Sequence, residues 1–565
     1  MNTPTRSTDE LYSCPRCGLT VGGENSSFSP PNILHSFCTS NKPPSPDELG
    51  SLRAGYETIS RSESTLDSEI SRLEASLADL KEKKQKTGEL LAVYRSVFSP
   101  LRQYPNEILG QIFGLCVEES ERDYAYHDAE ESRSSKYFSL TIDTGKCPWV
   151  LGQVCRRWRG IALSLPDLWT RINVDGGALP PEIVEDHVER RVSMALERAR
   201  DRPLSVSLSQ DSCRERVFSM VCSRSSQWKD AYIFVGISGL KMLTPCRGSF
   251  PMLSTLYLDL EEDGWQEHEQ DEAVKNAALS VFCDAPELHK VTLTGYLAPI
   301  TSPLITQIIP WKQITRLEMN PYDSGPDIRP IIPLLTNVSS CELGTFLFPG
   351  GPLMDPSTLL NLHTLALTST LARIPVDPLL DSVTLPALKK FDLRSGTSSI
   401  MTVVRFLERS SCRLEDLSLF RLDSRDLIEV LQTRAVQSVR VFSVRSRGVD
   451  RRDSHGGVDD RFLEALKLKQ TNNDTSRGDN ALRHLSELSL VGPKQWSDSS
   501  LVEMLASRAF LNQTLPLGTS RLTVVSFGLT GVDGLAFEDE AARVQMRGLI
   551  DGGLIVEVDG EVVSL

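Results

Sequence analysis

The sequence lacks the long apolar runs that cross membranes and the short motifs that most often mark an active site. It has no run of 18 or more apolar residues and no apolar stretch after Met1, so we expect neither a membrane span nor a secretory signal. The phosphate-binding loop Gly-x-x-x-x-Gly-Lys-(Ser/Thr), the Gly-x-Ser-x-Gly elbow and the zinc helix His-Glu-x-x-His are missing. The eight histidines are dispersed. These absences predict a protein that is not an enzyme.

Basic residues are also in short supply. The chain has 61 Lys and Arg against 75 Asp and Glu, a net charge of −14, which disfavours a nucleic-acid binder that works by neutralising phosphates. Its twelve cysteines are scattered singly apart from Cys14 and Cys17, which indicates free thiols in a reducing compartment, the cytoplasm or the nucleus. At 565 residues the chain should hold two or more structural units.

Residues 1–48 are rich in Ser, Pro, Asn and Gly, and we expect most of this tail to lack a packed core. Within it, Cys14 and Cys17 have the spacing of a zinc knuckle. His35 and Cys38 repeat that spacing, which gives Cys-x2-Cys-x17-His-x2-Cys. These four ligands would close a structural zinc site with no catalytic role. The alternative is a disordered tail with incidental cysteines, and both interpretations stay open.

Residues 50–98 have the periodicity of a coiled-coil helix. Apolar residues alternate at steps of four and three along Leu66, Ile70, Leu73, Leu77 and Leu80, which is the seam of a coiled coil. The seam weakens toward Thr87 and Gly88, and Ser99-Pro100 should end the helix. Such a coil would form a homodimer or bind a partner. A single amphipathic helix that folds onto the next segment is the alternative.

Two segments within residues 101–170 predict a small all-α module. In the first, Pro105 suits the opening turn of a helix, and four apolar residues follow on one helix face: Ile108, Leu109, Ile112 and Phe113. In the second, a similar face is formed by Leu151, Val154, Trp158 and Ala162. Between them lies the acidic, polar stretch 118–147, which we expect to be an inserted, solvated loop.

These segments resemble the F-box, whose pattern runs Leu-Pro-x-Glu-(Ile/Leu)-Leu-x-x-Ile-Phe and then Val-Cys-(Arg)-x-Trp-Arg-x-(Ile/Leu)-Ala. The matching residues are Pro105, Glu107, Ile108, Leu109, Ile112, Phe113, Val154, Cys155, Trp158, Arg159 and Ala162. Tyr104 stands where the family usually has Leu, and the inserted stretch is a larger departure. The Leu-Pro-x-Leu-Trp junction at residues 165–169 is similar to that of the large F-box family found in mushroom-forming fungi.

The resemblance implies a substrate-recognition adaptor of an SCF-type ubiquitin ligase. The F-box would bind a Skp-family adaptor and, through it, a cullin. The residues expected at that interface are Pro105, Ile108, Leu109, Ile112, Leu151, Val154 and Trp158. The main alternative is a non-enzymatic interaction scaffold with an ordinary helical hairpin, dimerised by its coiled coil. A zinc-dependent nucleic-acid binder is a further alternative, which the acidic balance disfavours.

Residues 171–540 contain a repeat, apolar-x-x-apolar-x-apolar, at the start of each expected strand. Its middle residues are Leu256, Val291, Leu317, Cys341, Leu365, Phe391, Leu417, Phe442, Leu488 and Val525. Most neighbours lie about 25 residues apart, the period of leucine-rich repeats. We therefore expect an α/β fold, an irregular leucine-rich-repeat solenoid of parallel strands with helical returns that would hold an unknown protein substrate.

Three further segments complete the prediction for the solenoid. The acidic stretch around 261–272 and the segment 445–480 lengthen the spacing, and we expect both to be solvated loops. Residues 541–565 should form a C-terminal cap, with a helix followed by a final strand at Leu554–Val558.

Overall fold

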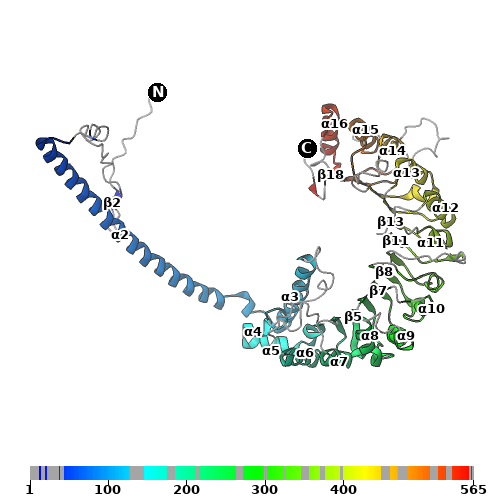
Figure 1. The fold of residues 1–565 in the computed structure, drawn as a ribbon. Helices are drawn as coiled ribbons and strands as arrows, with labels where there is room; N and C mark the ends of the chain where they lie inside the picture. Colours follow the sequence, from blue (N-terminus) through cyan, green and yellow to red (C-terminus); the bar gives the residue numbers. More distant parts are fainter. Residues whose placement is uncertain are drawn as a thin grey trace. The chain divides into compact units, whose positions relative to one another are not determined.

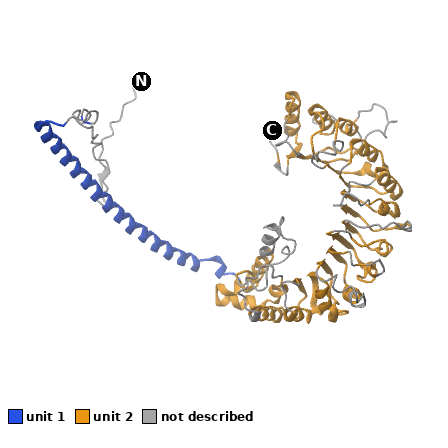
Figure 2. Cartoon of the chain, in the orientation of Figure 1, with its two compact units in different colours: residues 1–104 blue, residues 105–565 orange. Residues whose placement is uncertain are grey.

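The computed structural model divides the chain into two compact units, residues 1–104 and 105–565 (Figure 2). The structure describes residues 12–13, 20–21, 37, 43–127, 145–174, 185–209, 215–262, 272–297, 300, 302–322, 325–344, 356–368, 376–394, 399–420, 422–446, 458–468, 481–509, 519–529, 537–558 and 561–562. Within these residues, no helix combines the length and the apolarity needed to cross a membrane.

Unit 1 is dominated by one helix, α2 (Pro46–Val97), drawn in blue in Figure 1. It begins with a capping box, in which Ser45 Oγ accepts from the Glu48 N–H and the Glu48 carboxylate accepts from the Ser45 N–H at 2.8 Å. None of its residues is buried. A short 3₁₀ turn, η1 (Pro100–Arg102), follows where the proline was expected to end the helix.

Two short antiparallel strands, β1 (Tyr12–Ser13) and β2 (Thr20–Val21), precede this helix in unit 1. They flank the segment of the predicted knuckle. The predicted zinc ligands Cys14, Cys17, His35 and Cys38 lie outside the described residues, so the zinc site stays a prediction.

Unit 2 begins with a helical hairpin: α3 (Asn106–His127), α4 (Leu151–Val154), α5 (Arg156–Ser164) and the 3₁₀ turn η2 (Pro166–Trp169). The prediction of a loop from residue 118 is wrong for residues 118–127, which continue α3. This stretch contains neither proline nor glycine, so nothing in it stops a helix that has already begun. Residues 128–144 of the predicted loop lie outside the described residues.

The rest of unit 2 is one curved sheet of fourteen parallel strands, β3 to β18, with an antiparallel fifteenth strand, β19, at its end. The bounds are β3 (Arg171–Val174), β4 (Leu204–Ser209), β5 (Trp228–Val235), β6 (Thr255–Leu260), β7 (Lys290–Gly295), β8 (Arg316–Pro321), β9 (Ser340–Leu343), β11 (Thr364–Thr368), β13 (Lys390–Arg394), β14 (Asp416–Phe420), β15 (Val441–Arg445), β16 (Glu487–Gly492), β17 (Val524–Leu529), β18 (Ile555–Val558) and β19 (Glu561–Val562). The strands β10 (Ser357–Thr358) and β12 (Val383–Thr384) form a separate parallel pair.

The register of this sheet confirms the repeat found in the sequence. The middle residue of each predicted unit pairs with that of the next, from Leu256 with Val291 to Leu488 with Val525. The same row extends to β3 through Ile172, Val206 and Ala231, and to β18 through Val556. Each of these residues is buried, so an apolar row runs along the sheet from β3 to β18.

Helices return the chain on the opposite side, so that strands line the concave side of unit 2 and helices its convex side (Figure 1). They are α6 (Glu185–Ala199), α7 (Glu215–Cys222), α8 (Ile237–Leu243), α9 (Glu272–Leu279), α10 (Ser302–Ile305), α11 (Asp377–Ser382), α12 (Ile400–Ser410), α13 (Ser424–Leu431), α14 (Asp460–Leu466), α15 (Asp498–Ala509) and α16 (Glu540–Asp551). The 3₁₀ turns η3 (Ser225–Gln227), η4 (Thr244–Cys246), η5 (Ser280–Phe282), η6 (Trp311–Gln313), η7 (Ile332–Leu334) and η8 (Arg434–Ser438) complete the returns.

The structure corrects the predicted loop 445–480 and shows which elements form the predicted C-terminal cap. The segment 445–480 is not a loop throughout, because α14 lies within it and buries Phe462, Leu463 and Leu466. It is the return helix of its repeat. At seven residues it is too short to show a clear helical periodicity in the sequence. At the C-terminus, α16 and β18 lie where a helix and a strand were predicted, and β18 pairs in parallel with β17 as one more repeat.

One side chain, Arg508, holds the turn between repeats near the C-terminal end. It is 1% exposed, and its guanidinium donates to the carbonyls of Leu466 at 2.6 Å, Ala481 at 2.7 Å and Leu482 at 2.9 Å. Burial lowers the pKa of Arg508 to about 9. The side chain therefore donates to three backbone carbonyls, one of which, that of Leu482, also accepts from the Leu485 N–H at 3.2 Å.

We expect Arg508→Lys to destabilise unit 2, because one ammonium group cannot reproduce a planar fork aimed at three carbonyls. Each carbonyl left unpaired should cost roughly 1–3 kcal/mol of unfolding free energy. Urea unfolding monitored by circular dichroism measures the loss. Arg425→Lys, at an exposed position of α13, is the matched control and should leave the midpoint unchanged. Equal stability of the two variants would contradict this role for Arg508.

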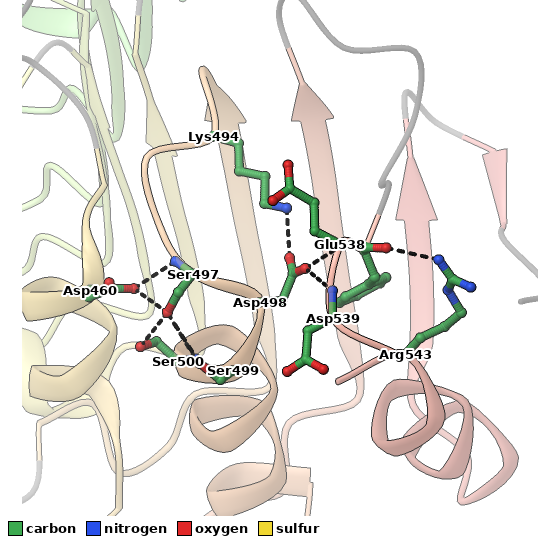
Figure 3. A network of polar contacts seen from close by, with 10 residues as sticks. Asp460, Lys494, Ser497, Asp498, Ser499, Ser500, Glu538, Asp539 and Arg543 are labelled. Carbon is green, nitrogen blue, oxygen red and sulfur yellow. Dashed lines mark hydrogen bonds and ion pairs between the residues drawn. The ribbon is translucent and has the colours of Figure 1, made fainter. Parts of the chain in front are cut away.

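Polar side chains in the first turns of several helices accept hydrogen bonds from the start of the next helix (Figure 3). Asp460 Oδ1 accepts from the Ser497 N–H at 2.8 Å, ahead of α15. Asp498 Oδ2 accepts from the N–H groups of Glu538 at 2.7 Å and Asp539 at 3.1 Å, ahead of α16. The first four N–H groups of a helix have no partner within the helix, so these bonds fix adjacent returns to each other.

Asp498 should supply stability that depends on pH. Burial by itself raises its pKa, but hydrogen bonds from Lys494, at 2.6 Å, and from the two backbone N–H groups outweigh burial and lower the pKa below its usual value. Because the folded-state pKa is lowered, this stabilisation is present above the unfolded pKa, about 3.9, and is lost as the pH falls through the folded pKa.

The matching prediction is that Asp498→Ala lowers the free energy of unfolding at pH 7 by roughly 1–3 kcal/mol. The difference from the parent chain should shrink as the pH falls below about 4. Unfolding curves at several pH values test this, with Asp201→Ala at an exposed turn as the control. A difference that is constant with pH would show that the carboxylate charge is not responsible.

Candidate partner-binding surfaces

Helix α3 carries two apolar faces, one buried and one exposed. Leu109, Phe113 and Val117 recur every four residues and are at most 8% exposed, so this face belongs to the core. Ile108, Ile112 and Leu115 recur at steps of four and three on another face. On that face Ile108 is 41% and Leu115 62% exposed, with Ile112 half-buried between them.

The helices α4 and α5 complete the hairpin, and α5 packs against the buried face of α3. Cys155 begins α5 by accepting at Sγ from the Trp158 N–H at 3.4 Å. The Trp158 ring lies 4.8 Å from the ring of Phe113, between centroids. Arg157 Nε donates to Asn106 Oδ1 at 3.0 Å and so ties the start of α3 to α5. Packing and hydrogen bonding together therefore join α3 to α5.

A tryptophan pair attaches the hairpin to the first repeat of the solenoid. Trp169 Nε1 donates to the Ala162 carbonyl at 2.9 Å, and its ring meets that of Trp149 edge-on at 4.9 Å. The Arg198 guanidinium of α6 lies 4.7 Å from the Trp149 ring and 4.3 Å from the Trp169 ring. Partial burial lowers the pKa of Arg198, so these cation–π contacts form where the guanidinium has lost part of its hydration.

The structure separates the seven predicted adaptor-binding residues into three groups. Pro105, Ile108 and Val154 are exposed, with Val154 58% exposed. Ile112 and Trp158 are half-buried and pack against the core. Leu109 and Leu151 are 0% and 5% exposed and lie in the hairpin core, and their contact with an adaptor stays a prediction. Residues inside the hairpin core support the exposed face from below.

The F-box pattern did not include Leu115, which at 62% is more exposed than Ile108 on the outer face of α3. The signal was present in the sequence as the spacing Ile108, Ile112, Leu115. It was missed because the motif ends at Phe113, on the inner face.

A hollow of about 390 Å³ lies beside the hairpin, between α3 and the junction of η2 with β3. Asn106, Gly110, Gly114 and Leu168 are among the residues that line it. At Gly110 a Cβ atom would lie 2.9 Å from Leu165 Cδ1, so α3 approaches the Leu165 side chain closely here. Unit 2 therefore has two concave features, the concave side of the sheet and this hollow beside the hairpin.

The concave side of the sheet presents a long row of residues, one from each parallel strand from β5 to β18, that alternate with the buried apolar row. We call it the sheet-face row. In register it runs Tyr232, Tyr257, Thr292, Glu318, Glu342, Ala366, Asp392, Ser418, Ser443, Ser489, Ser526 and Glu557. The row begins with the stacked rings of Tyr232 and Tyr257, whose centroids lie 6.2 Å apart. An acidic stretch follows, and serines then occupy four neighbouring strands.

In the acidic stretch of the sheet-face row, Glu318, Glu342 and Asp392, the charged form of Glu342 is disfavoured. Burial, and then the charges of Glu318 and Asp392, raise the pKa of Glu342. Asp392 is held by Arg394, whose Nη2 donates to Asp392 Oδ2 at 2.7 Å. Closely spaced acidic groups on a concave surface favour a basic partner over an acidic one.

No arrangement of three or more His, Cys, Asp or Glu side chains that could hold a metal ion occurs among the residues that the structure describes. The four predicted zinc ligands are not among those residues.

Comparison with known proteins adds little to this description. No protein-family model and no curated protein matches the sequence. Among solved structures, the chain is similar to a crystal structure of a Bacteroides fragilis protein, a structural genomics target, at 12% identity and a TM-score of 0.27. The match covers 58% of this chain and 78% of that one. A similarity of this size carries no argument about function.

We expect Glu342→Gln to raise the free energy of unfolding at pH 7, because it removes a carboxylate whose charged form the fold disfavours. An acid with a raised folded-state pKa contributes stability at low pH that is lost as the pH rises through that pKa. The gain should therefore disappear below the ordinary glutamate pKa, about 4.3. Unfolding at pH 4 and pH 7 tests this, with Glu408→Gln at an exposed position of α12 as the control. A gain of equal size at both pH values would contradict the electrostatic cause.

Proposed function

We propose that this chain is an F-box substrate-recognition adaptor of an SCF-type ubiquitin ligase. In this proposal the hairpin α3–α5 binds a Skp-family adaptor and, through it, a cullin. The solenoid binds a protein substrate, and other subunits of the ligase transfer ubiquitin. The F-box resemblance of the hairpin sequence supplies the identity of the partner.

The observation that carries the proposal is the exposed apolar face of α3. A helix in a small module that already buries one apolar stripe has no need of a second one. Ile108, Leu115 and, on α4, Val154 are nonetheless exposed, and exposed apolar side chains gathered on one module favour a partner helix or groove. The tryptophan pair Trp149 and Trp169 would keep that face at a fixed distance from a substrate held on the solenoid.

The concave sheet supports the substrate half of the proposal. A stack of fourteen parallel strands offers a broad, rigid surface whose side chains vary from repeat to repeat. The sheet-face row changes from aromatic to acidic to serine along that surface, which is a pattern suited to reading an extended protein segment. The acidic stretch would contact basic residues of the substrate.

A non-enzymatic scaffold independent of ubiquitin is the second candidate. The uncovered apolar seam of α2 favours it, because self-association through that helix needs no ligase. In a scaffold the hairpin would serve only as the first cap of the solenoid.

Co-purification of the full chain with a Skp-family adaptor tests the two candidates. The decisive variant is Ile108→Ala/Leu115→Ala/Val154→Ala, which changes exposed residues and spares the hairpin core. We expect the parent chain to form a stable complex and this variant to lose at least 100-fold in affinity, which corresponds to about 1 kcal/mol for each side chain. Isothermal titration calorimetry measures the difference.

The matched control removes three exposed apolar residues from the solenoid, Met252→Ala/Leu360→Ala/Met401→Ala. It should bind the adaptor as the parent does, and circular dichroism should show that both variants are folded. A parent chain that folds but forms no complex would reject the F-box assignment and leave the scaffold. A complex that survives the hairpin variant would place the interface elsewhere.

A further inference from the structure

The helix α2 carries an apolar stripe that none of the described residues of its own unit covers. None of its 52 residues is buried, and Leu66, Ile70 and Leu77 are each more than half exposed. The stripe follows a heptad pattern along much of the helix, with apolar residues at the two positions, a and d, that face a partner in coiled coils. An isolated amphipathic helix of this kind gains stability from burying that stripe against another chain.

The heptad phase follows from the four-three alternation of the stripe. Residues at d are Leu52, Ile59, Leu66, Leu73 and Leu80, and those at a are Tyr56, Ile70, Leu77 and Leu91. Two charged residues interrupt position a, namely Glu63 and Lys84. A charge within the seam fixes which alignments of the two helices are tolerated.

Charge is distributed unevenly along the helix. Residues 46–79 contain eight acidic and three basic residues, whereas residues 80–97 contain two acidic and five basic residues. A parallel, in-register pair would place Glu63 against Glu63 and Lys84 against Lys84 inside the seam. It would also place Glu69 beside Glu74 on the flank. A second copy lying antiparallel brings the acidic half of each helix against the basic half of the other.

We propose that α2 pairs with α2 of a second copy of this chain in an antiparallel coiled coil. The alignment that places a residues opposite d residues and joins opposite charges puts Leu73 opposite Leu77 of the second copy. The next layers along the seam are Ile70 with Leu80, Leu66 with Lys84, Glu63 with Thr87, Ile59 with Leu91, Tyr56 with Tyr94, and Leu52 with Phe98 of the second copy. Glu63 then lies one layer from Lys84 of the second copy.

The flanking positions support this alignment. Asp67 lies beside Lys81 of the second copy, and Glu69 lies beside Lys83 of the second copy. The twofold axis repeats each pair. Two repulsions oppose them, one between the two Glu74 side chains on the axis and one between Arg53 and Arg95 of the second copy. Within one helix Glu69 also pairs with Arg72 at 2.5 Å and Lys83 with Asp79 at 2.6 Å. These are exposed pairs that contribute little, so they do not oppose the intermolecular ones.

Charge-reversal variants of the full chain test both the pairing and its direction. In Asp67→Lys/Glu69→Lys and in Lys81→Glu/Lys83→Glu, all four flanking contacts of the antiparallel pair become repulsive. Sedimentation velocity should show the parent near twice 62.7 kDa and each variant at least tenfold weaker in self-association. An equimolar mixture of the two variants should restore the dimer, because each of the four altered contacts again joins opposite charges.

Two further variants serve as controls. The chain with all four reversals has the parent's net charge and should dimerise as the parent does. Glu82→Lys/Lys86→Glu exchanges an ion pair on the outer side of the helix, 2.5 Å apart in the parent, and should have no effect. A monomeric parent would overturn the proposal. Dimers that persist in both charge-reversal variants, or that the mixture fails to restore, would overturn the antiparallel alignment.

Discussion

The constraint on which unit 2 depends is the constant register of its parallel strands. No single repeat can bury its own apolar residues, so each strand needs a neighbour whose middle residue lies directly beside its own. From Ile172 in β3 to Val556 in β18 this condition is met at every step, despite unequal return segments. Variable returns are tolerated because they lie on the other side of the sheet, where helices such as α14 and α15 pack against each other.

That stack also decides what the hairpin can do. The hairpin and the solenoid share one continuous hydrophobic core, so the buried face of α3 is used to close the first repeats. The remaining apolar side chains, Ile108, Leu115 and Val154, are then available to a partner. The arginine of α6 that lies over Trp149 and Trp169 makes the attachment stiff. A rigid link between two binding surfaces is what an adaptor that positions a substrate requires.

The proposed functions use three separate surfaces with different chemistry. The outer face of α3 is apolar, the sheet-face row is polar with an acidic stretch around Glu342, and the seam of α2 is apolar with charges of opposite sign at its two halves. Each surface therefore selects a different kind of contact. If both proposals hold, the protein presents two hairpins and two solenoids in one assembly.

The sequence by itself determined the repeat, the strand register and the span of the long helix, because these follow from local periodicity. The spacing of Leu256, Val291 and Leu317 was sufficient to predict which residues pair. Only the tertiary structure decided which side of each helix is covered. Leu109 and Leu151 match an interface motif yet are buried, while Leu115 lies outside the motif and is exposed. Periodicity identifies apolar faces, but when a helix has two of them, only packing against the rest of the chain decides which one is left for a partner.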